Sequence, residues 1–568
     1  MISTVLDLKC RILYTLRASI FYFHRTTEGS RFQNPIAFNY EGRELIDLVQ
    51  KTKDWALMHG AGMRSKNNYS DDALQFAPFT MLPSVFPRNE FHQVVQMQTV
   101  FNELIHKVAH NRQFLTDTLK NTIEADEFTR NLFKIYETVS NEGITQRSSL
   151  GILRSDYMLQ NSEYPYTPFL CQKQVEINTI ASGFGWLGPV SAHIHRFGFL
   201  MFELLGRGIK SPPLFVKMYT CRLFLSIHGR NIFVQRYCLG LLRSDYFAHA
   251  LQNTVAIHQV EVNAIASKSL TSFYRNHLNL NWFNLTLFSF YHYSAVILFI
   301  VEDVTYNICD HRFHEFEIQE LEPAAKVVRR NLTEMGKHAS LGKKKELLID
   351  GMEVALVYYR SGYAPVQYPS QLEWDARLLI ERSLAIKCPS IQYHLAGTKK
   401  VQQVLASPNV LERLLKDEDT IKSIRKIFTG LYSLDLDAEG DAAVKMGIEE
   451  PAKFVLKPQR EGGGNNVYGE NIRKVLQDMQ HSEERKAWIL MERIFPPVQK
   501  NVLVRPGEKE PMFADIVSEL GIFGVIIGDA DHIQVNRQAG HMLRSKLSNA
   551  DEGGVAAGSG VLDSPLLV

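Results

Sequence analysis

The sequence of 568 residues predicts an α/β (α+β) fold with a large buried core. Two observations support this class. Apolar side chains recur at helical spacing in residues 90–140, whereas short continuous apolar runs alternate with polar, helix-forming stretches after residue 294. Short apolar runs are typical of buried strands. We therefore expect functional side chains at strand ends and in loops of the second half.

The helical part is predicted by two apolar stripes. The first lies on one helical face and the second begins soon after it, and both are typical of core positions rather than of a cofactor site. Their residues are Val94, Met97, Phe101, Leu104, Ile105 and Val108, followed by Phe114, Leu115 and Leu119.

Strands are predicted along the second half in a fixed order. Buried strands are expected within 294–301 and at 354–359, and a helical stretch follows around 374–385. Further strands are predicted at 454–456, 489–491 and 516–517, with a polar, helix-forming stretch at 469–486.

Composition argues against several classes. The net charge of +2 gives no global field toward nucleic acid or an anionic membrane. The six cysteines show no metal-binding spacing, which predicts free thiols in a reducing compartment. Residues 1–25 lack the pattern of a secretory leader. Polar residues interrupt the most apolar window, 281–301, which favours a buried strand over a membrane span, although a membrane-attached or scaffold protein built on 187–301 is a competing hypothesis.

The middle of the chain repeats two of its own segments. Residues 150–157 recur as 239–246, and residues 174–182 recur as 259–267. A single duplication is not a solenoid repeat. The flanking sequence is almost free of acids, which is atypical of a globular surface. We therefore expect an irregular insertion at 187–293, and favour alternative exons and translated intron merged in one predicted gene over a genuine lineage-specific insertion.

The strongest functional motif is Lys457-Pro458-Gln459-Arg460-Glu461-Gly462-Gly463-Gly464-Asn465-Asn466, with Tyr468 close behind. Lys457 leaves a predicted strand and can neutralise phosphate, and Glu461 offers a hard oxygen ligand for Mg²⁺. The glycine triplet lets backbone N–H groups approach a polyphosphate. The spacing differs from that of a P-loop. The motif therefore predicts a nucleotide site of another kind.

Three weaker motifs follow it along the chain. Residues 491–494 end an apolar run whose edge can meet adenine, and residues 518–521 place Glu519 at a predicted strand end. Arg544-Ser545-Lys546 precedes a Gly/Ala loop at 553–558, which suits the clamping of phosphate and carboxylate groups under a flexible lid. Ordinary core, a solvated turn and a basic surface turn are the alternative interpretations.

Together these strings resemble the eukaryotic glutathione synthetase family of ATP-grasp ligases. Residues 76–80, 154–157, 176–179, 360–363 and 396–400 also match its motifs, and the likeness covers about 70–185 and 294–568. The resemblance implies an ATP-grasp fold with a parallel-sheet substrate-binding domain, a helical N-terminal part and a mobile lid. It also implies ATP- and Mg²⁺-dependent joining of γ-glutamylcysteine to glycine through an acyl phosphate.

The resemblance implies a role for each matched residue. Arg544 and Lys457 would be catalytic, and Glu176, Asn178 and Glu461 would hold Mg²⁺. ATP would contact Glu176, Lys399, Lys457, Pro458, Gln459, Arg460, Glu461, Gly462, Gly463, Gly464, Asn465, Asn466, Tyr468, Met491, Glu492, Arg493, Ile494, Glu519, Lys546 and Glu552, or its neighbour Asp551. The dipeptide and glycine would contact Arg154, Ile180, Ala181, Ser182, Gly183, Asn307, His311, Arg360, Ser361, Gly362, Tyr363, Arg544, Val555 and Ala556.

The sequence also departs from the family pattern. Ala181-Ser182-Gly183 stands where the family has two serines flanking an alanine, and His311 stands where it has glutamine. The second copy of the repeat lacks the Phe184-Gly185 continuation, so we expect the first copy to form the site.

The expected organisation follows from these matches. It comprises a disordered extension (1–35), an N-terminal part with the first substrate and metal segment (36–186), the insertion (187–293), a substrate-binding domain (294–410) and a nucleotide-binding and lid region (411–568). The resemblance implies a cytoplasmic homodimer that binds small molecules and neither nucleic acid nor membrane. A catalytically impaired relative, disabled by the insertion, is the alternative.

Overall fold

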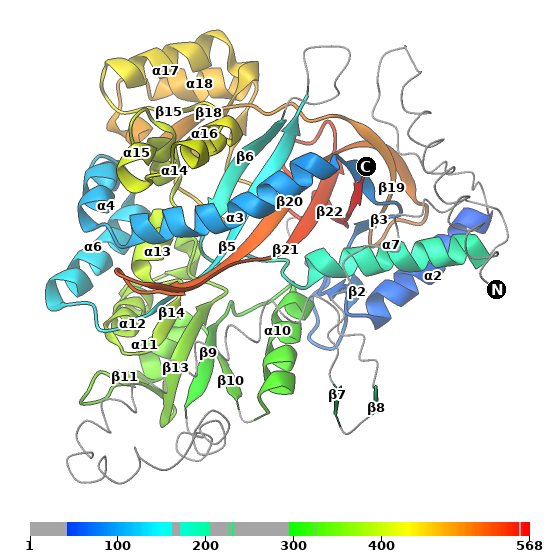
Figure 1. The fold of residues 1–568 in the computed structure, drawn as a ribbon, viewed down its shortest axis with the longest axis horizontal. Coiled ribbons are helices and arrows are strands. Elements are labelled where there is room, and N and C mark those ends of the chain that lie inside the picture. Colours follow the sequence, from blue (N-terminus) through cyan, green and yellow to red (C-terminus); the bar gives the residue numbers. More distant parts are fainter. Residues whose placement is uncertain are drawn as a thin grey trace, which may run out of the picture.

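A computed structural model describes residues 43–161, 171–204, 226–227, 230–231, 295–323, 325–555 and 558–568. The expected extension at 1–35 and the second copy of the repeat lie outside these residues. Helices pack on three larger sheets (Figure 1), which confirms the predicted α/β (α+β) class.

The central sheet has seven strands in the order β19-β3-β22-β21-β20-β5-β6. It joins residues from both ends of the chain, because β3 and β5 come from the first third and β19 to β22 from the last. The strands are β3 (Phe79–Thr80), β5 (Ser149–Gln160), β6 (Cys171–Asn178), β19 (Gln499–Val504), β20 (Met512–Gly528), β21 (Ile533–Leu547) and β22 (Gly560–Asp563).

The helix of the first predicted stripe packs on one face of this sheet. Helix α3 (Arg88–Ala109) crosses β20 and β21 in Figure 1 and buries Val94, Phe101 and Leu104. The shorter helices after it are α4 (Arg112–Leu119), α5 (Thr122–Ala125) and α6 (Glu127–Glu142), and Asn111 and Asp126 cap α4 and α6 with their side chains. The helical prediction for 90–140 is confirmed.

The second sheet has six strands, four of which run parallel. Their carboxyl ends meet at one edge, where ligands bind in open α/β sheets. The parallel strands are β9 (Val296–Ile300), β10 (Lys326–Arg330), β13 (Met352–Tyr359) and β14 (Ile386–Cys388), and β11 (Ala339–Leu341) and β12 (Leu347–Ile349) add antiparallel pairs. Helices α10 (Ile308–Leu321), α11 (Leu332–His338), α12 (Gln371–Arg382), α13 (Ile391–Ala396), α14 (Lys399–Ala406), α15 (Leu411–Leu414) and α16 (Glu418–Ile427) lie between or after these strands.

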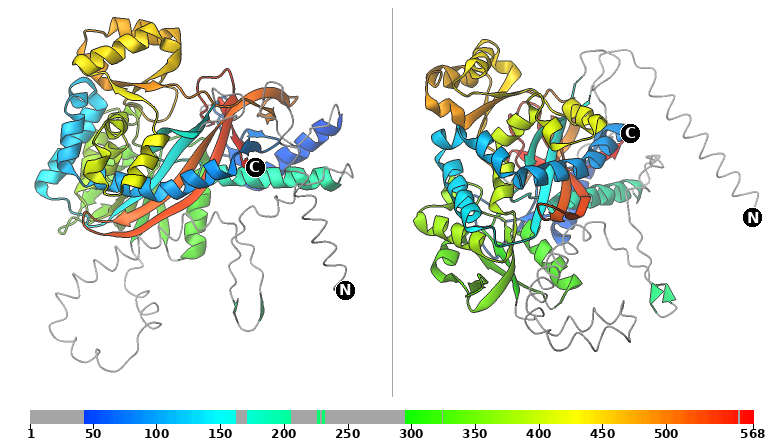
Figure 2. Two further views of the ribbon diagram at one scale, coloured as in Figure 1. Left: turned by 45° about the horizontal axis from the view of Figure 1, so that its top comes forward. Right: turned by 60° about the vertical axis from the view of Figure 1, so that its left-hand side comes forward.

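The third sheet forms a small unit of its own at the top of Figure 1 and of the left view in Figure 2. Its strand order is β15-β18-β16-β17, all antiparallel. The elements are β15 (Leu431–Ser433), α17 (Ala438–Glu449), β16 (Phe454–Pro458), β17 (Val467–Tyr468), α18 (Glu470–Asp478) and β18 (Trp488–Glu492). Apolar faces of α17 and α18 pack on β16 and β18 around Leu456, Leu476 and Leu490.

The start of the predicted insertion differs from the structure. Residues 187–204 form helix α7 (Leu187–Leu204), which packs on α2 (Arg43–Met58), β21 and β22. His195 on α7 is buried and contacts Ser564 and Thr80. A helix that is buried by its neighbours needs few acids, which explains why acidic residues are rare at the start of the predicted insertion. Apart from β7 (Ser226–Ile227) and β8 (Arg230–Asn231), the rest of 205–293 lies outside the described residues.

One strand prediction was too short and one strand was not predicted. The run at 516–517 lies inside β20, whose 17 residues include Glu519, so this carboxylate lies within a strand and not at its end. Arg544 and Lys546 likewise lie in β21 rather than in a turn. Near Arg544 and Lys546 in β21, polar residues alternate with apolar ones, because one face of the sheet lines a cavity. The strands at 354–359, 454–456 and 489–491 and the helix near 374–385 are confirmed.

None of the described helices is both long and apolar enough to cross a membrane. Within the window at 281–301, the described part contains strand β9, as predicted, and residues before 295 lie outside the description. Cys171, Cys309 and Cys388 are free thiols.

A buried ion pair beside the parallel sheet leads to a stability prediction. Arg377 and Glu381 on α12 are joined over 3.0 Å, almost without exposure, and the guanidinium lies 4.0 Å from the centre of the Tyr359 ring. Arg377→Met leaves Glu381 buried without its partner, so we expect a loss of about 3–5 kcal/mol in the free energy of unfolding. Denaturant titration measures it. The exposed pair Lys445–Glu449 is the control, and an equal loss in Lys445→Met would contradict the prediction.

Candidate active site

A cavity of about 450 Å³ lies where the three sheets meet. Each sheet supplies part of its wall, so residues far apart in the sequence converge there. Predicted residues in the lining are Arg154, Glu176, Asn178, Ile180, Ala181, Gly183, Asn307, His311, Arg360, Tyr363, Lys399, Lys457, Arg460, Glu461, Gly462, Gly463, Asn465, Asn466, Tyr468, Met491, Glu492, Arg493, Ile494, Glu519, Arg544, Lys546, Asp551, Glu552 and Val555.

Two carboxylates share one lysine at the centre of this cavity. Lys399 Nζ lies 3.1 Å from Glu176 Oε2 and 2.7 Å from Glu461 Oε1. Burial alone would raise the pKa of Glu176, but Lys399, Lys457 and Arg544 hold that pKa well below its usual value. Burial raises the pKa of Glu461 and the neighbouring Glu176 carboxylate adds to this, and together they outweigh the opposing effect of Lys399 and Lys457. An additional cation at this point would therefore stabilise the ionised form of both.

The chemistry of these groups fits Mg²⁺, which prefers oxygen ligands and keeps several waters. Asn178 Nδ2 donates to Asp156 Oδ2 over 3.0 Å, which fixes the amide and leaves its oxygen as an acceptor. Among the described residues, no group of three His, Cys, Asp or Glu side chains could hold a metal alone. Two carboxylates and an amide suit an ion that shares its coordination with phosphate oxygens.

Two further cations border the carboxylates. Lys457 lies within β16, one residue before the strand ends, rather than after it, and its ammonium group donates to Val175 O over 2.9 Å. Burial lowers the pKa of Lys457. On β21, Arg544 donates to Glu519 Oε1 over 2.5 Å and lies 3.8 Å from Asp156. Burial opposes its charge, but the carboxylates of Glu519 and Asp156 raise the pKa of Arg544 above its usual value.

The cavity also presents two buried guanidinium groups. Arg154 is held by both oxygens of Asp156 and donates to Gly183 O over 2.9 Å. Arg360 donates to Asp310 Oδ2 over 3.0 Å. Fixed guanidinium groups of this kind are suited to the recognition of carboxylates.

The segment between these two arginines has a strained backbone. Ala181 and Phe184 have φ values of 48° and 66°, which side-chain-bearing residues rarely adopt. Asp310 accepts from the N–H groups of Phe184, Trp186 and Leu187, and these bonds stabilise the turn. Strain that surrounding contacts maintain is common at ligand sites.

The glycine loop lies over the cavity and contacts the second predicted lid. Gly462, Gly463 and Gly464 have φ values of 96°, 71° and 80°, a region in which a Cβ atom would be strained. The carboxylate of Glu552 accepts from the backbone N–H groups of Gly464 and Asn466. These N–H groups can therefore bind an anionic oxygen, which supports the predicted interaction with phosphate.

Glu552 and Asp551 have different partners, although either matches the family motif. Asp551 Oδ1 lies 3.4 Å from Arg493, and its carbonyl accepts from Lys546 Nζ over 2.5 Å. Only Glu552 reaches the glycine loop through its carboxylate.

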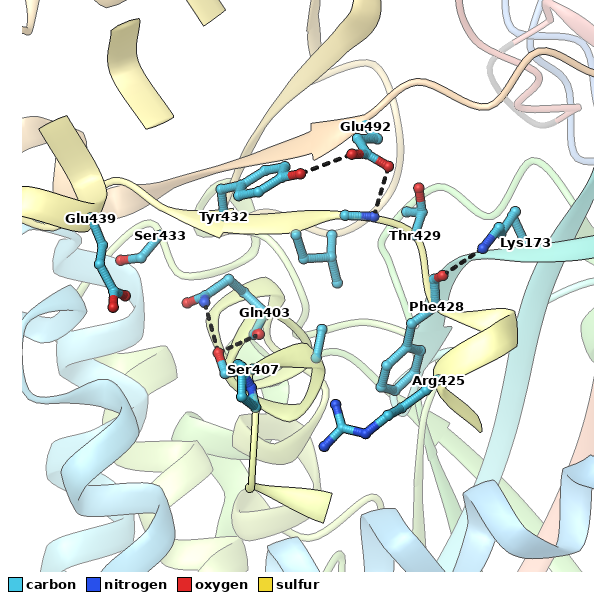
Figure 3. Close-up of a pocket in the computed structure, with 14 residues that line it drawn as sticks. Lys173, Gln403, Ser407, Arg425, Phe428, Thr429, Tyr432, Ser433, Glu439 and Glu492 are labelled. Carbon is cyan, nitrogen blue, oxygen red and sulfur yellow. Dashed lines mark hydrogen bonds between the residues drawn. The ribbon is translucent and has the colours of Figure 1, made fainter. Parts of the chain in front are cut away.

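Glu492 lines the cavity but also faces a second hollow of about 500 Å³ behind β18 (Figure 3). Its carboxylate accepts from Tyr432 Oη over 2.8 Å and from Gly430 N over 3.1 Å. The bond to Glu492 adds to the effect of burial, and the two raise the pKa of Tyr432 to about 12. The contact of Glu492 with adenine stays a prediction, and it would have to be made by the backbone, because the carboxylate is bonded to Tyr432 and Gly430.

Several predicted residues do not line the cavity. Gln459 follows the end of β16, and its side chain accepts from Lys400 N over 3.1 Å. Ser182 donates to Ile152 O and Asn178 O, and Gly362 N donates to Gln367, so both support the lining from behind. Pro458 pairs with Trp488, Ser361 is buried, and Gly464 bonds to Glu552. Ala556 lies outside the described residues.

Sequence reasoning missed the acids that hold the arginines. Asp156 lies two residues after Arg154 and so on the same face of β5, a spacing that signals a pair. Asp310 lies next to His311 and gave no such signal. Glu302 follows the carboxyl end of β9 and accepts from Tyr363 Oη over 2.9 Å, and its place after a buried parallel strand was the available clue.

Comparison with known proteins gives the family. The profile of the eukaryotic glutathione synthase ATP-binding domain matches residues 42–206 and 215–567. The chain belongs to the eukaryotic glutathione synthetase family. It is 38% identical to glutathione synthetase of Xenopus laevis over 526 residues, which cover 92% of this chain and 97% of the relative. Identity to glutathione synthetase of Homo sapiens is 37% with the same coverage, and to the chloroplastic glutathione synthetase of Arabidopsis thaliana it is 35%, covering 92% and 85%.

A solved structure of this family confirms the fold. A glutathione synthetase-like effector of Globodera pallida, solved without ligand, superposes with a TM-score of 0.65 at 21% identity. The match covers 93% of this chain and 98% of the effector, so the resemblance extends over all three sheets of this family's fold.

Proposed function

We propose that this chain is a glutathione synthetase, an ATP-dependent ligase that joins γ-glutamylcysteine to glycine and releases glutathione, ADP and phosphate. The observation that carries the proposal is the convergence of Glu176, Lys399, Lys457, Glu461 and Arg544 in one cavity, although they are spread over 369 positions of the chain, on two sheets, the loop after β16 and the start of α14. The reaction is inferred from the family, and the cavity contains the charged groups that this reaction needs.

The chemistry explains why cations must surround the carboxylate. A carboxylate does not acylate an amine directly because its oxygen is a poor leaving group. Transfer of the γ-phosphoryl group of ATP forms an acyl phosphate, which the amine of glycine attacks with loss of phosphate. Lys457 and Lys399 offset phosphate charge, and Arg544 neutralises the carboxylate and then the tetrahedral oxyanion.

A magnesium ion held by Glu176, Glu461 and Asn178 would neutralise phosphate charge and align the phosphates. Arg154 and Arg360 fit the carboxylates of the dipeptide. Acyl phosphates hydrolyse, so water must be kept out during transfer. Glu552, directly before the loop at 553–558, contacts the glycine loop, and the two loops together can cover the cavity.

The direct test supplies purified protein with ATP, Mg²⁺, γ-glutamylcysteine and glycine. We expect ADP to form with a stoichiometric amount of glutathione, measured by coupled assay and mass spectrometry, only when both amino substrates are present. ADP release without peptide product would point to the impaired relative. No product with any combination would contradict the proposal. The similarity to curated glutathione synthetases over most of the chain favours an active enzyme over an impaired relative.

The proposal includes a homodimer in the cytoplasm, as the resemblance implies. Sedimentation analysis tests the homodimer, and microscopy of the tagged full-length protein tests the cytoplasmic location. Two related enzymes from Solanum lycopersicum and Arabidopsis thaliana are named chloroplastic, so compartments differ within the family.

A further inference from the structure

A series of buried hydroxyl groups lies behind β20 and β21, the strands that carry Glu519, Arg544 and Lys546. Ser545 Oγ on β21 donates to Asp563 Oδ2 at the end of β22 over 2.5 Å. Ser518 Oγ on β20 lies 2.7 Å from Ser545 Oγ. Asp563 is fully buried and Ser545 and Ser518 nearly so. Hydrogen bonds in such surroundings are strong, and their loss is costly.

Donors surround the Asp563 carboxylate. Ser84 donates through its hydroxyl over 2.5 Å and through its N–H over 3.2 Å, and Ser564 donates through its N–H over 2.7 Å. Within the described part of the chain, no lysine or arginine forms an ion pair with it. Burial raises the pKa of Asp563 to about 6, so the group is ionised at neutral pH and depends on these donors.

The number of available hydroxyl protons decides which serine donates in each of these hydrogen bonds. A serine hydroxyl carries one hydrogen, and that of Ser545 is used on the carboxylate. Ser518 must therefore donate to Ser545, which fixes the rotamers of both serines toward Asp563. Alternate residues of a strand face opposite sides, so Glu519, Arg544 and Lys546 point the other way and line the cavity.

We propose that Asp563, through Ser545 and Ser518, is a positioning residue that sets where β20 and β21 present Glu519, Arg544 and Lys546 to ATP and the acyl group. The inference rests on the proposed function, and it adds to it a requirement for a residue that touches no substrate. Displacement of a reacting group by about 1 Å can cost roughly 100-fold in rate, so a small relaxation of either strand is measurable.

Two serines allow a matched test, because each donates a hydroxyl to the same carboxylate oxygen. Ser545 lies between the catalytic cations, whereas Ser84 lies on β4 (Ser84–Phe86), away from the cavity. Ser545→Ala is expected to lower kcat by roughly 10-fold and to weaken ATP binding several-fold. Ser84→Ala should keep kcat and KM within about 2-fold, while both variants lose similar thermal stability. Ser545→Thr, which keeps the hydroxyl, should restore kcat.

Equal kinetic effects in the two alanine variants, or none in either, would overturn the proposal and leave Asp563 a purely structural residue. Isothermal titration of ATP and Mg²⁺ is carried out on all three variants and the unmodified chain. This measurement needs no turnover, so it still compares Ser545 with Ser84 if the unmodified chain makes no glutathione. Failure of the proposed function is thereby distinguished from failure of this inference.

Discussion

Replacing Arg544 with alanine is expected to lower kcat/KM for synthesis by roughly 10³-fold, to the limit of detection, because it removes the cation that meets the developing oxyanion. The guanidinium is held by Glu519 and Asp156, so it is fixed before substrate arrives. A charge that is already fixed does not have to reorient during the reaction. A water molecule that enters in place of the guanidinium does not reproduce this stabilisation of the oxyanion.

The fold should persist in Arg544→Ala, because Asp156 keeps both bonds to Arg154. Steady-state kinetics gives the rate, and circular dichroism with thermal denaturation checks the fold. Arg544→Lys keeps the charge but loses the planar fork, and we expect it to recover only part of the activity. Near-normal turnover in the alanine variant would remove Arg544 from the mechanism.

The second large effect is expected for Glu461→Gln. The change removes one of the two carboxylates that share Lys399, and with it a proposed oxygen ligand of Mg²⁺. We expect the Mg²⁺ concentration for half-maximal rate to rise at least 10-fold and kcat to fall by roughly 10²-fold, since charge on the phosphates is then offset less completely. Initial rates over a range of Mg²⁺ concentrations at saturating ATP measure both quantities.

Glu302→Gln is the matched control, because Glu302 is a carboxylate in the same cavity but bonds to Tyr363 and Gln367. Its magnesium dependence should match that of the unmodified chain. If both variants shift this dependence equally, the effect comes from overall charge and Glu461 is not a ligand. Since the pKa of Glu461 is raised, lower pH should also weaken the activation by Mg²⁺ in the unmodified chain, because protonation removes the ligand.

Much of the fold class followed from local patterns. The stripe at Val94, Phe101 and Leu104 predicted α3 because helical periodicity is a property of neighbouring residues. The short apolar run at 354–359 predicted β13 for the same reason. Only residues 516–517 of the long strand β20 were predicted, because polar residues such as Asp515, Ser518 and Glu519 interrupt the apolar run in its first half.

The sequence by itself determined which residue types were present for chemistry: a lysine after a strand, a glutamate beside three glycines, and an arginine and lysine on either side of a serine. Only the tertiary structure decided which way they point. It turned Gln459 and the Glu492 carboxylate away from the proposed ATP contacts, paired Arg154 with Asp156, and placed Asp563 behind Arg544. The physical reason is that strand pairing between residues hundreds of positions apart fixes which face of each strand meets the cavity, and no local pattern carries that information.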